Sequence, residues 1–505
     1  MKYQCYFGDI HNHCNASYGH GDPEDALRNA RLQLDFTSIT GHSSWPDIPE
    51  RKPPLESLVD YHVNGFARLE DGWQNFVDLI KSYNRPGQFV AFPSYEIHSM
   101  ADGDYTIYFQ RNLERMLKPR SIPELQKNVL EERARGGDAF IVPHHIGYKN
   151  GFRGINWDSF REETSPVVEI VSMHGCSESD QAAFPYLHTM GPRNGRNTMQ
   201  AGLSRGYHFG VTGSTDHHSA HPGSHGYGRV AVWAEELTDE SIWSALINRR
   251  CYAVTGDKII LNYSLNGSVM GQVLPFVKER EHRILLAAGD SLDYVELLKN
   301  NSVVKRYDFP ANQEAHKARR TGKARGKLFI EAGWGDRGVR AAWDIRIRIG
   351  RGDILGVEPR LHGFDTVDPN FSPEGSFHFS RWDRQDREIR LTTQTFGNPN
   401  TLTNTNQGIC LEISGTSETE IAITANSKTF QTDIRTISES SDSFYLKEFL
   451  SGAVHVHRFV PESEYRKELG YSDSGYGRRE DFYYVRVRQR NGQWAYSTPI
   501  WVKAR

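Results

Sequence analysis

Gly8-Asp9-Ile10-His11-Asn12-His13 ends an apolar run, and a third imidazole follows closely in Tyr18-Gly19-His20-Gly21. Side chains alternate along a strand, so His11 and His13 are expected to point the same way. A His-x-His pair alone is weak evidence for a metal site. Several later strand-like runs also end in His, Glu or Asp, and the pattern as a whole therefore directs attention to the strand ends.

Length and composition describe an ordinary globular chain. Its 505 residues are 37% hydrophobic and 24% charged, enough for two or three domains with large cores. A formal net charge of -3 argues against a nucleic-acid or anionic-membrane partner, and no apolar run approaches a bilayer span. The N-terminus lacks an apolar signal core, so a cytoplasmic location is expected. Five cysteines without a CxxC pair indicate neither a disulfide framework nor a zinc knuckle.

Residues 1–255 read as alternating strands and helices. Asp22-Pro23-Glu24-Asp25 predicts a helix start, with Asp as N-cap and Pro at the first helical position. Short apolar runs precede each candidate ligand group, at 4–10, 34–40, 88–92, 139–142, 167–171 and 209–212. Six or more such units over this length predict a parallel βα barrel, whose active site lies at the C-terminal strand ends.

Residues 256–505 differ in character. Apolar and charged residues alternate with period two, as in Ala342-Trp343-Asp344-Ile345-Arg346-Ile347. This alternation predicts antiparallel strands with one wet face, and Asn491-Gly492 predicts a hairpin turn. The second half is therefore expected to be an all-β accessory region.

The candidate metal ligands share their place at the ends of predicted strands or in the turns that follow. They are His11, His13, His20, His42, Glu96, His144 or His145, His174, Asp216 and His218. Imidazole and carboxylate ligands suit zinc, manganese or iron. The set exceeds the needs of one tetrahedral ion and predicts two or three divalent metals. A single histidine of this kind is more often a hydrogen-bonded loop residue; the whole set indicates a site.

These motifs resemble the PHP (polymerase and histidinol phosphatase) superfamily. The resemblance rests on 8–13, Thr40-Gly41-His42, the Glu96 strand end, Pro143-His144-His145 and 213–218. Asn12-His13-Cys14, Tyr18-Gly19-His20-Gly21 and 252–257 further resemble its DUF3604 branch, which pairs a PHP barrel with a C-terminal β region. The resemblance implies a distorted (β/α)7 barrel over 1–255, a β-rich domain over 256–505 and phosphoester hydrolysis.

The resemblance also implies a ligand assignment for three ions. The first would take His11, His13, Glu96 and Asp216. The second would take Glu96, His144 or His145, and His174; the third, His20, His42 and His218. The sequence departs from the family pattern at Gly41, where an Asp is usual, and at His20, which replaces an acidic residue. Both departures bear on the third ion.

Candidates for substrate contact follow the ligand motifs. Trp45 is either a pocket wall or core. Tyr148, Lys149 and Arg153 lie in a Gly-rich loop, where Arg suits phosphate or carboxylate recognition but a solvated loop charge is the commoner case. His221 and His225 flank the last motif, and one of them, His221 first, is a candidate general acid for the leaving group. Arg153 is the other catalytic candidate. Glu169 is expected to orient a ligand or to form a structural pair, and His98 to be a ligand neighbour or a bystander.

The function expected from these residues is that of a metal-dependent hydrolase acting on a small molecule. Phosphoester hydrolysis leads, by resemblance; hydrolysis of a carboxylic ester, carbamate or lactone is the alternative. A third reading makes the β region a glycan- or protein-binding module beside a relic barrel. The sequence leaves a homo-oligomer open.

Overall fold

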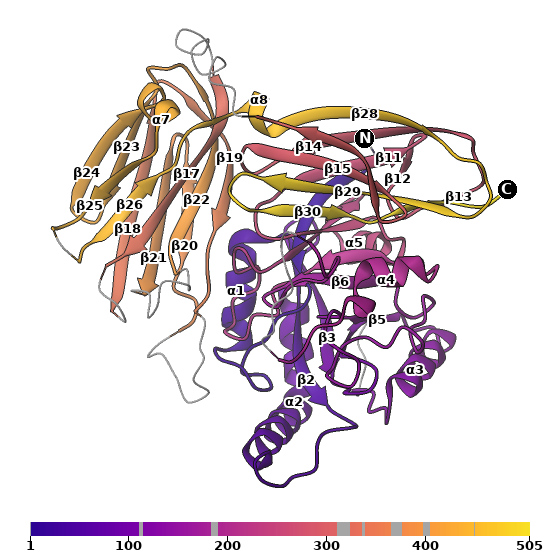
Figure 1. The fold of residues 1–505 in the computed structure, drawn as a ribbon. Coiled ribbons are helices and arrows are strands. Elements are labelled where there is room, and N and C mark those ends of the chain that lie inside the picture. The colour runs from indigo at the N-terminus through magenta and orange to yellow at the C-terminus, as the bar shows by residue number, and fades with distance from the viewer. Residues whose placement is uncertain are drawn as a thin grey trace.

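The computed structural model describes residues 2–110, 115–182, 190–310, 324–335, 339–364, 376–396, 405–448 and 450–505. The strands and helices of the first half form the lower part of the molecule in Figure 1, and two β-rich parts lie above and to the left. No helix in these ranges is long and apolar enough to cross a membrane.

The first half mixes strands and helices: they alternate from β1 to β3, but β4 follows β3, β6 follows β5 and β9 follows β8 without a helix between them. Its strands are β1 (Gln4–Asp9), β2 (Phe36–Ser44), β3 (Val90–Ile97), β4 (Tyr105–Phe109), β5 (Ala139–Pro143), β6 (Val167–Ser172), β7 (Gly175–Cys176), β8 (Gly210–Gly213), β9 (Arg229–Ala234) and β10 (Cys251–Val254). Its helices are α1 (Pro23–Gln33), α2 (Glu56–Tyr83), α3 (Ile122–Ala134), the 3-10 helix η1 (Gly195–Asn197), α4 (Met199–Ser204) and α5 (Asp239–Ile247). The predicted helix start is confirmed, since α1 begins at Pro23.

The closed (β/α)7 barrel is not confirmed, because hydrogen bonds join the described strands of the first half into two separate sheets. β1, β2 and β3 run parallel, but β4 is antiparallel to β3 and β5, and β9 is antiparallel to β1. β6, β7 and β8 form a sheet of their own. A short connection without a helix links β3 to β4, and such a connection favours an antiparallel pair. Even so, β6 lies beside β5, and β8 beside β9 and β10, which gathers the strand ends on one side.

The larger sheet also crosses the predicted boundary at residue 255. β10 pairs with β30, and the sheet continues through β29 and β31 to β13. The predicted hairpin around Asn491-Gly492 is confirmed, because β29 and β30 pair antiparallel on either side of it. The last strands of the chain are thus hydrogen-bonded to the first half, and the division at 255 stays a prediction.

The second half is mostly strand over its described residues. Its strands are β11 (Ile260–Leu265), β12 (Ser268–Val269), β13 (Val273–Leu274), β14 (Glu279–Ala287), β15 (Leu292–Lys299), β16 (Ser302–Asp308), β17 (Ala324–Trp334), β18 (Arg340–Gly350), β19 (Asp353–Arg360), β20 (Arg381–Gln385), β21 (Glu388–Phe396), β22 (Gln407–Gly415), β23 (Glu420–Ala425), β24 (Lys428–Asp433), β25 (Asp442–Tyr445), β26 (Gly452–Val456), β27 (Val460–Pro461), β28 (Arg466–Ser474), β29 (Asp481–Gln489), β30 (Trp494–Ser497) and β31 (Ile500–Val502). Two short helices, α7 (Ile434–Glu439) and α8 (Glu462–Tyr465), interrupt them.

Two antiparallel sheets in this half share one apolar core. One contains β17, β19, β22, β25, β26 and β27, and the other β18, β20, β21, β23 and β24. The predicted alternation is confirmed in β18, where Ile345 and Ile347 are buried and Arg346 and Arg348 are exposed. This part docks on α1: Asp25 accepts the backbone N–H of Phe377 at 2.8 Å, and Trp382 Nε1 donates to the Leu32 carbonyl at 2.9 Å.

A buried histidine in β14 predicts how stability varies with pH. His282 contacts the Tyr263 hydroxyl through Nδ1, and its Nε2 has no hydrogen-bond partner among the described residues. Burial, with Arg280 and Lys299 nearby, lowers its pKa to about 4. The unfolded chain therefore binds a proton that the folded chain does not, and stability is lost as pH falls from about 6.5 towards 4. We expect His282→Gln to remove up to about 1.4 kcal/mol per pH unit of this loss, measured by urea unfolding at pH 7 and 5.

The quantity to compare between variants is the change in the free energy of unfolding per pH unit, not the free energy at one pH. Burial and the neighbouring His457 also lower the pKa of His455 in β26, but this side chain is partly exposed. His455→Gln is therefore the matched control, and it should remove less of the wild-type slope than His282→Gln does. Equal slopes in the wild-type and His282→Gln proteins would contradict the expected linkage.

Candidate metal centre

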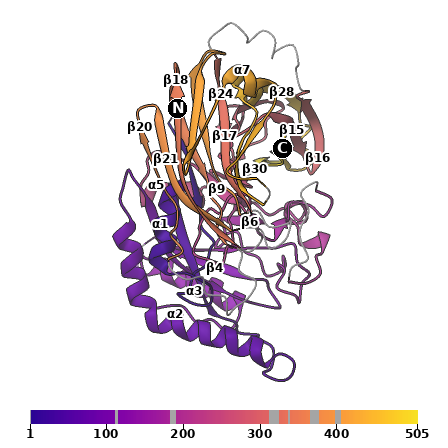
Figure 2. The same cartoon turned by 90° about the vertical axis from the view of Figure 1, so that its left-hand side faces the viewer.

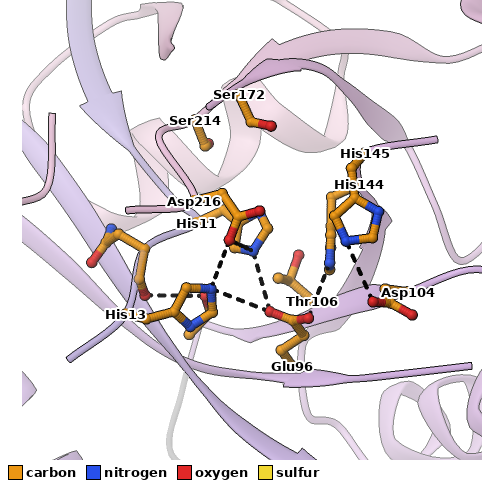
Figure 3. A network of polar contacts seen from close by, with 12 residues as sticks. His11, His13, Glu96, Asp104, Thr106, His144, His145, Ser172, Ser214 and Asp216 are labelled. Atoms are coloured by element: carbon orange, nitrogen blue, oxygen red, sulfur yellow. Dashed lines mark hydrogen bonds and ion pairs between the residues drawn. The ribbon is translucent and has the colours of Figure 1, made fainter. Parts of the chain in front are cut away.

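Histidine and carboxylate side chains from several strand ends meet in one largely buried cluster. Figure 3 shows His11, His13, Glu96, His144 and Asp216 of this cluster. The members lie in, or directly after, six strands: β1, β2, β3, β5, β6 and β8. The predicted ligands in the cluster are His11, His13, His42, Glu96, His144, His174, Asp216 and His218. Convergence follows from the arrangement of the strands, whose ends gather on one side.

Glu96, in β3, lies at the middle of the cluster. Three imidazole Nε2 atoms surround its Oε2 atom at 3.2, 3.4 and 3.5 Å, those of His11, His13 and His42. Its Oε1 atom lies 3.1 Å from His98 Nδ1 and 3.2 Å from His144 Nε2. A carboxylate with this many imidazole nitrogens around it has the surroundings expected of a residue that bridges metal ions.

Asp216 forms a second centre after β8. Its Oδ1 atom lies 3.0 Å from His13 Nε2 and 3.4 Å from His11 Nε2, and its Oδ2 atom lies 2.9 Å from His174 Nε2. The His218 ring lies tilted against that of His13, with centroids 4.2 Å apart. Asp216 has a φ of 54°, a left-handed conformation that is unusual for a residue other than glycine. Backbone strain of this kind gathers at functional sites.

Asp104 is a member of the cluster that the sequence prediction missed. Its carboxylate lies 2.8 Å from His98 Nδ1, 3.3 Å from His145 Nε2 and 2.7 Å from Arg153 Nε. It directly precedes β4, whose antiparallel direction brings that strand's start beside the ends of β3 and β5. The sequence prediction considered only the C-terminal ends of parallel strands. The one available signal was an acidic residue immediately before an apolar run.

The described residues contain four overlapping groups whose potential ligand atoms lie within 4.8 Å of one another. They are His11-His13-Asp216, His13-His42-His218, His42-Glu96-His98 and Glu96-Asp104-His144-His145. The first matches most of the predicted first site. Both imidazoles of the predicted His144-or-His145 choice belong to the fourth group, so the choice between them stays open.

Two predicted ligands lie outside these four groups. His20 stacks on Phe377 with centroids 6.5 Å apart, and its backbone N–H donates to the His218 carbonyl at 2.8 Å. His13 instead completes a group with His42 and His218. His174 contacts Asp216 rather than Glu96. The assignments of His20 to the third ion and of His174 to the second stay predictions from resemblance.

Further buried side chains hold the ligands in place. Glu169 Oε2 lies 2.8 Å from His11 Nδ1, so its predicted role in orienting a ligand agrees with its position. Asp9 accepts the Thr215 hydroxyl and the backbone N–H groups of His11, Thr215 and Gly223, which ties the first motif to the last. The Tyr18 hydroxyl contacts His98 Nε2 at 2.6 Å.

The electrostatics of the cluster suit cations. Burial lowers the pKa of His145 and of His218 to about 3 and that of His42 well below its ordinary value, so these imidazoles are neutral and keep a lone pair for a metal. Burial opposes ionisation of Glu96, but the charge of His98 and the hydrogen bond from His11 hold its pKa well below the ordinary value. Nearby carboxylates raise the pKa of His11 and of His98 in spite of burial, so an ion held by either imidazole would displace a proton. Imidazoles together with ionised carboxylates form the donor set that zinc, manganese and iron accept. The residues present therefore fit divalent ions.

The predicted substrate-contact residues lie at different depths. Arg153 bonds Asp104, and its guanidinium lies 5.2 Å from the Trp45 ring, so both border the cluster. Tyr148 is fully buried, and its hydroxyl contacts His174 Nδ1 at 2.9 Å, which places it behind a candidate ligand. Lys149 is exposed and lies over the Phe152 ring. The roles of these residues stay predictions.

His221, the predicted general acid, lies away from the four groups. The centroid of its buried ring is 5.9 Å from that of Phe379 and 6.4 Å from that of His217. Gly363 packs so closely that a Cβ added there would lie 2.6 Å from the Cβ of His221. The second half of the chain thus packs against it. Neither ring nitrogen has a hydrogen-bond partner among the described residues, and this packing gives the general-acid role no support.

Comparisons with known proteins give partial matches. No family model matches the chain. An uncharacterized protein from Chlamydia muridarum is 27% identical over 311 residues, covering 54% of this chain and 50% of that protein. One from Chlamydia pneumoniae is 24% identical over 277 residues, covering 50% and 44%, and one from Chlamydia trachomatis is 28% identical over 171 residues, covering 30% and 28%. The matched regions thus span half the length or less of these relatives.

One solved structure aligns with most of the chain. It comes from Bacteroides vulgatus and is described as a two-domain protein containing a predicted PHP-like metal-dependent phosphoesterase. The alignment covers 86% of this chain and 96% of that one, at 11% sequence identity and a TM-score of 0.30. A TM-score at this level does not establish a shared fold. The case for a metal site therefore stands on the clustered side chains, and the DUF3604 branch stays a prediction.

Proposed function

We propose that the protein is a metal-dependent hydrolase, and that its substrate is a small-molecule phosphate ester. The observation that carries the proposal is the position of Glu96, with imidazole nitrogens of five histidines within 3.5 Å of its two carboxylate oxygens. Divalent ions held by such a set would polarise an ester and make a water molecule more acidic.

The proposed holders follow from the groups that the fold assembles. His11, His13 and Asp216 would hold one ion, and Glu96 with His144 and His145 a second. His42 and His218, with His13 or His98 beside them, offer donors for a third. We propose that two or three of these sites bind a divalent ion, which is manganese, zinc or iron.

Arg153 supports an anionic substrate. Its guanidinium reaches Asp104 and His98 and lies 4.0 Å from Glu96 Oε1, and its side chain keeps 17% of its surface exposed. A partly exposed guanidinium beside a metal cluster can orient a phosphoryl group with paired hydrogen bonds. Buried walls around the cluster would exclude bulk water and strengthen these charge interactions.

Substrate turnover by metal-loaded protein tests the proposal. Protein loaded with manganese or zinc is assayed with p-nitrophenyl phosphate, its diester and p-nitrophenyl acetate. We expect turnover of a phosphate ester that EDTA abolishes and added metal restores. His11→Ala should lower it by more than about 100-fold, since this imidazole contacts Glu96, Asp216 and Glu169 together.

The same assay can contradict the assignment to phosphate esters. Turnover of the acetate alone, lost in His11→Ala, would assign the protein to the hydrolysis of carboxylic esters, carbamates or lactones. His455→Ala replaces a partly exposed histidine in β26 and is the matched control, with activity expected within about twofold of wild type.

A further inference from the structure

Helix α2 presents aromatic side chains to one edge of the metal cluster. His62 and Phe66 are four residues apart and share a helix face. Their ring centroids lie 5.8 and 6.2 Å from that of His98, a neighbour of Glu96. Tyr61 lies beside them, 4.8 Å from the Tyr18 ring. Figure 2 shows α2 along the lower edge of the molecule. Tyr61 is exposed, and His62 and Phe66 are half-buried.

Trp45 closes this group of rings from the loop after β2. Its centroid is 5.1 Å from that of His62 and 5.3 Å from that of His98. Trp45 is only 8% exposed, and its Nε1–H has no hydrogen-bond partner among the described residues. A buried donor without an acceptor costs free energy, and an oxygen atom of a ligand would remove that cost. The Arg153 guanidinium over the same indole would favour a negatively charged oxygen.

Exposure rises along these rings from the cluster outward. His98 is fully buried, Trp45 is nearly so, and Tyr61 is 40% exposed. A ligand that reaches the carboxylates along this side would therefore pass from aromatic faces to the metal donors. Aromatic faces favour a planar ring, by offset stacking or edge-to-face contact, over an aliphatic group of similar size.

We propose that Trp45, Tyr61, His62 and Phe66 form an aromatic subsite that binds the leaving group of an aromatic phosphoester. Trp45 Nε1–H and the Arg153 guanidinium donate hydrogen bonds to a phosphoryl oxygen, while the aromatic rings contact the aryl group. This inference rests on the proposed function and adds to it the class of substrate.

Binding of phosphonates, which are not hydrolysed, tests the subsite apart from catalysis. The full chain loaded with manganese is titrated by calorimetry with methylphosphonate, cyclohexylphosphonate and phenylphosphonate. We expect phenylphosphonate to bind about tenfold more tightly than methylphosphonate, with cyclohexylphosphonate between them. Trp45→Leu and Phe66→Leu should each reduce the preference for phenyl to about twofold or less.

A second variant separates the indole N–H from the ring. Trp45→Phe keeps an aromatic face and removes the donor, so it should weaken all three phosphonates by the same factor, about fivefold, and keep the preference for phenyl. Tyr476→Leu, at a side chain that is 83% exposed in the second half, is the control and should change neither quantity. Metal content is measured for every variant, so that loss of the cluster is not mistaken for loss of the subsite.

The outcomes divide between the two proposals. Equal binding of phenylphosphonate and cyclohexylphosphonate, or a phenyl preference that survives Trp45→Leu with full metal content, overturns the aromatic subsite and leaves the phosphoesterase proposal standing. Unchanged binding in Trp45→Phe overturns the role of the indole N–H. Metal-loaded protein that binds none of the phosphonates overturns the phosphoesterase proposal, and the subsite with it.

Discussion

Glu96→Gln is expected to abolish metal binding at the centre of the cluster and to lower hydrolytic activity by more than about 100-fold. The amide keeps the size of the carboxylate but carries no charge, and its NH2 group would replace an oxygen that faces imidazole nitrogens. Loss of a residue that merely orients a ligand costs 10- to 100-fold, so loss of a shared ligand should cost more. Metal equivalents per chain, from elemental analysis, and turnover of the best substrate measure the effect together.

The control for this variant removes an equally buried carboxylate elsewhere. Glu178 is fully buried and pairs with Arg486 at 2.9 Å and with the Tyr484 hydroxyl at 2.8 Å. Glu178→Gln should lower stability but keep the metal content of wild type. Wild-type metal content in Glu96→Gln would show that Glu96 is not a ligand and would remove the central support for the proposed function.

Arg360→Met is expected to lower the free energy of unfolding by about 3–5 kcal/mol, the cost of leaving a buried charge without its partner. Arg360 is 1% exposed, and its Nε lies 3.2 Å from Asp257 and 3.3 Å from Glu358. Asp257 also contacts His225 at 2.9 Å and Gln489 at 2.7 Å. Asp257 thus joins three stretches of the second half to His225 of the first, and the loss of Arg360 should destabilise the packing around this carboxylate. Urea unfolding measures it.

Two further variants define that effect. Arg351 has a side chain that is 63% exposed and pairs with Glu420, so Arg351→Met should change stability by less than about 0.5 kcal/mol. Adding Asp257→Asn to Arg360→Met removes the unpaired carboxylate, and the pair should cost less than the sum of the single changes. Strictly additive losses would mean that the two side chains do not interact.

The sequence located most of the candidate cluster because of a simple geometric rule. Polar residues that follow buried parallel strands meet at one edge, and His11, His42, Glu96 and Asp216 obey that rule. The same rule could not find Asp104, since it precedes an antiparallel strand. Nor could it decide the role of His98, which contacts Glu96 and Asp104 of its own β3–β4 segment and Tyr18 from a distant stretch of the chain.

Resemblance supplied an assignment of ligands to three ions that local pattern alone could not supply, and the place of His20 in it stays a prediction. His20 sits in the motif where a third-site ligand is expected, yet its ring lies against Phe377 from the second half. Spacing along the chain fixes how near two residues are in a turn. It does not fix which of two neighbouring rings faces the cluster, because that depends on what packs on the other side.

By itself the sequence determined the local elements: the helix start at Pro23, the period-two strands of the second half, and the strand ends that carry imidazoles. These depend on short-range backbone preference and on burial patterns. Only the tertiary structure decided the direction of β4, the pairing of β10 with β30 across residue 255, and the gathering of five histidines around Glu96. Those features depend on contacts between segments far apart in the chain. The free energies of such contacts cannot be inferred from a local sequence pattern.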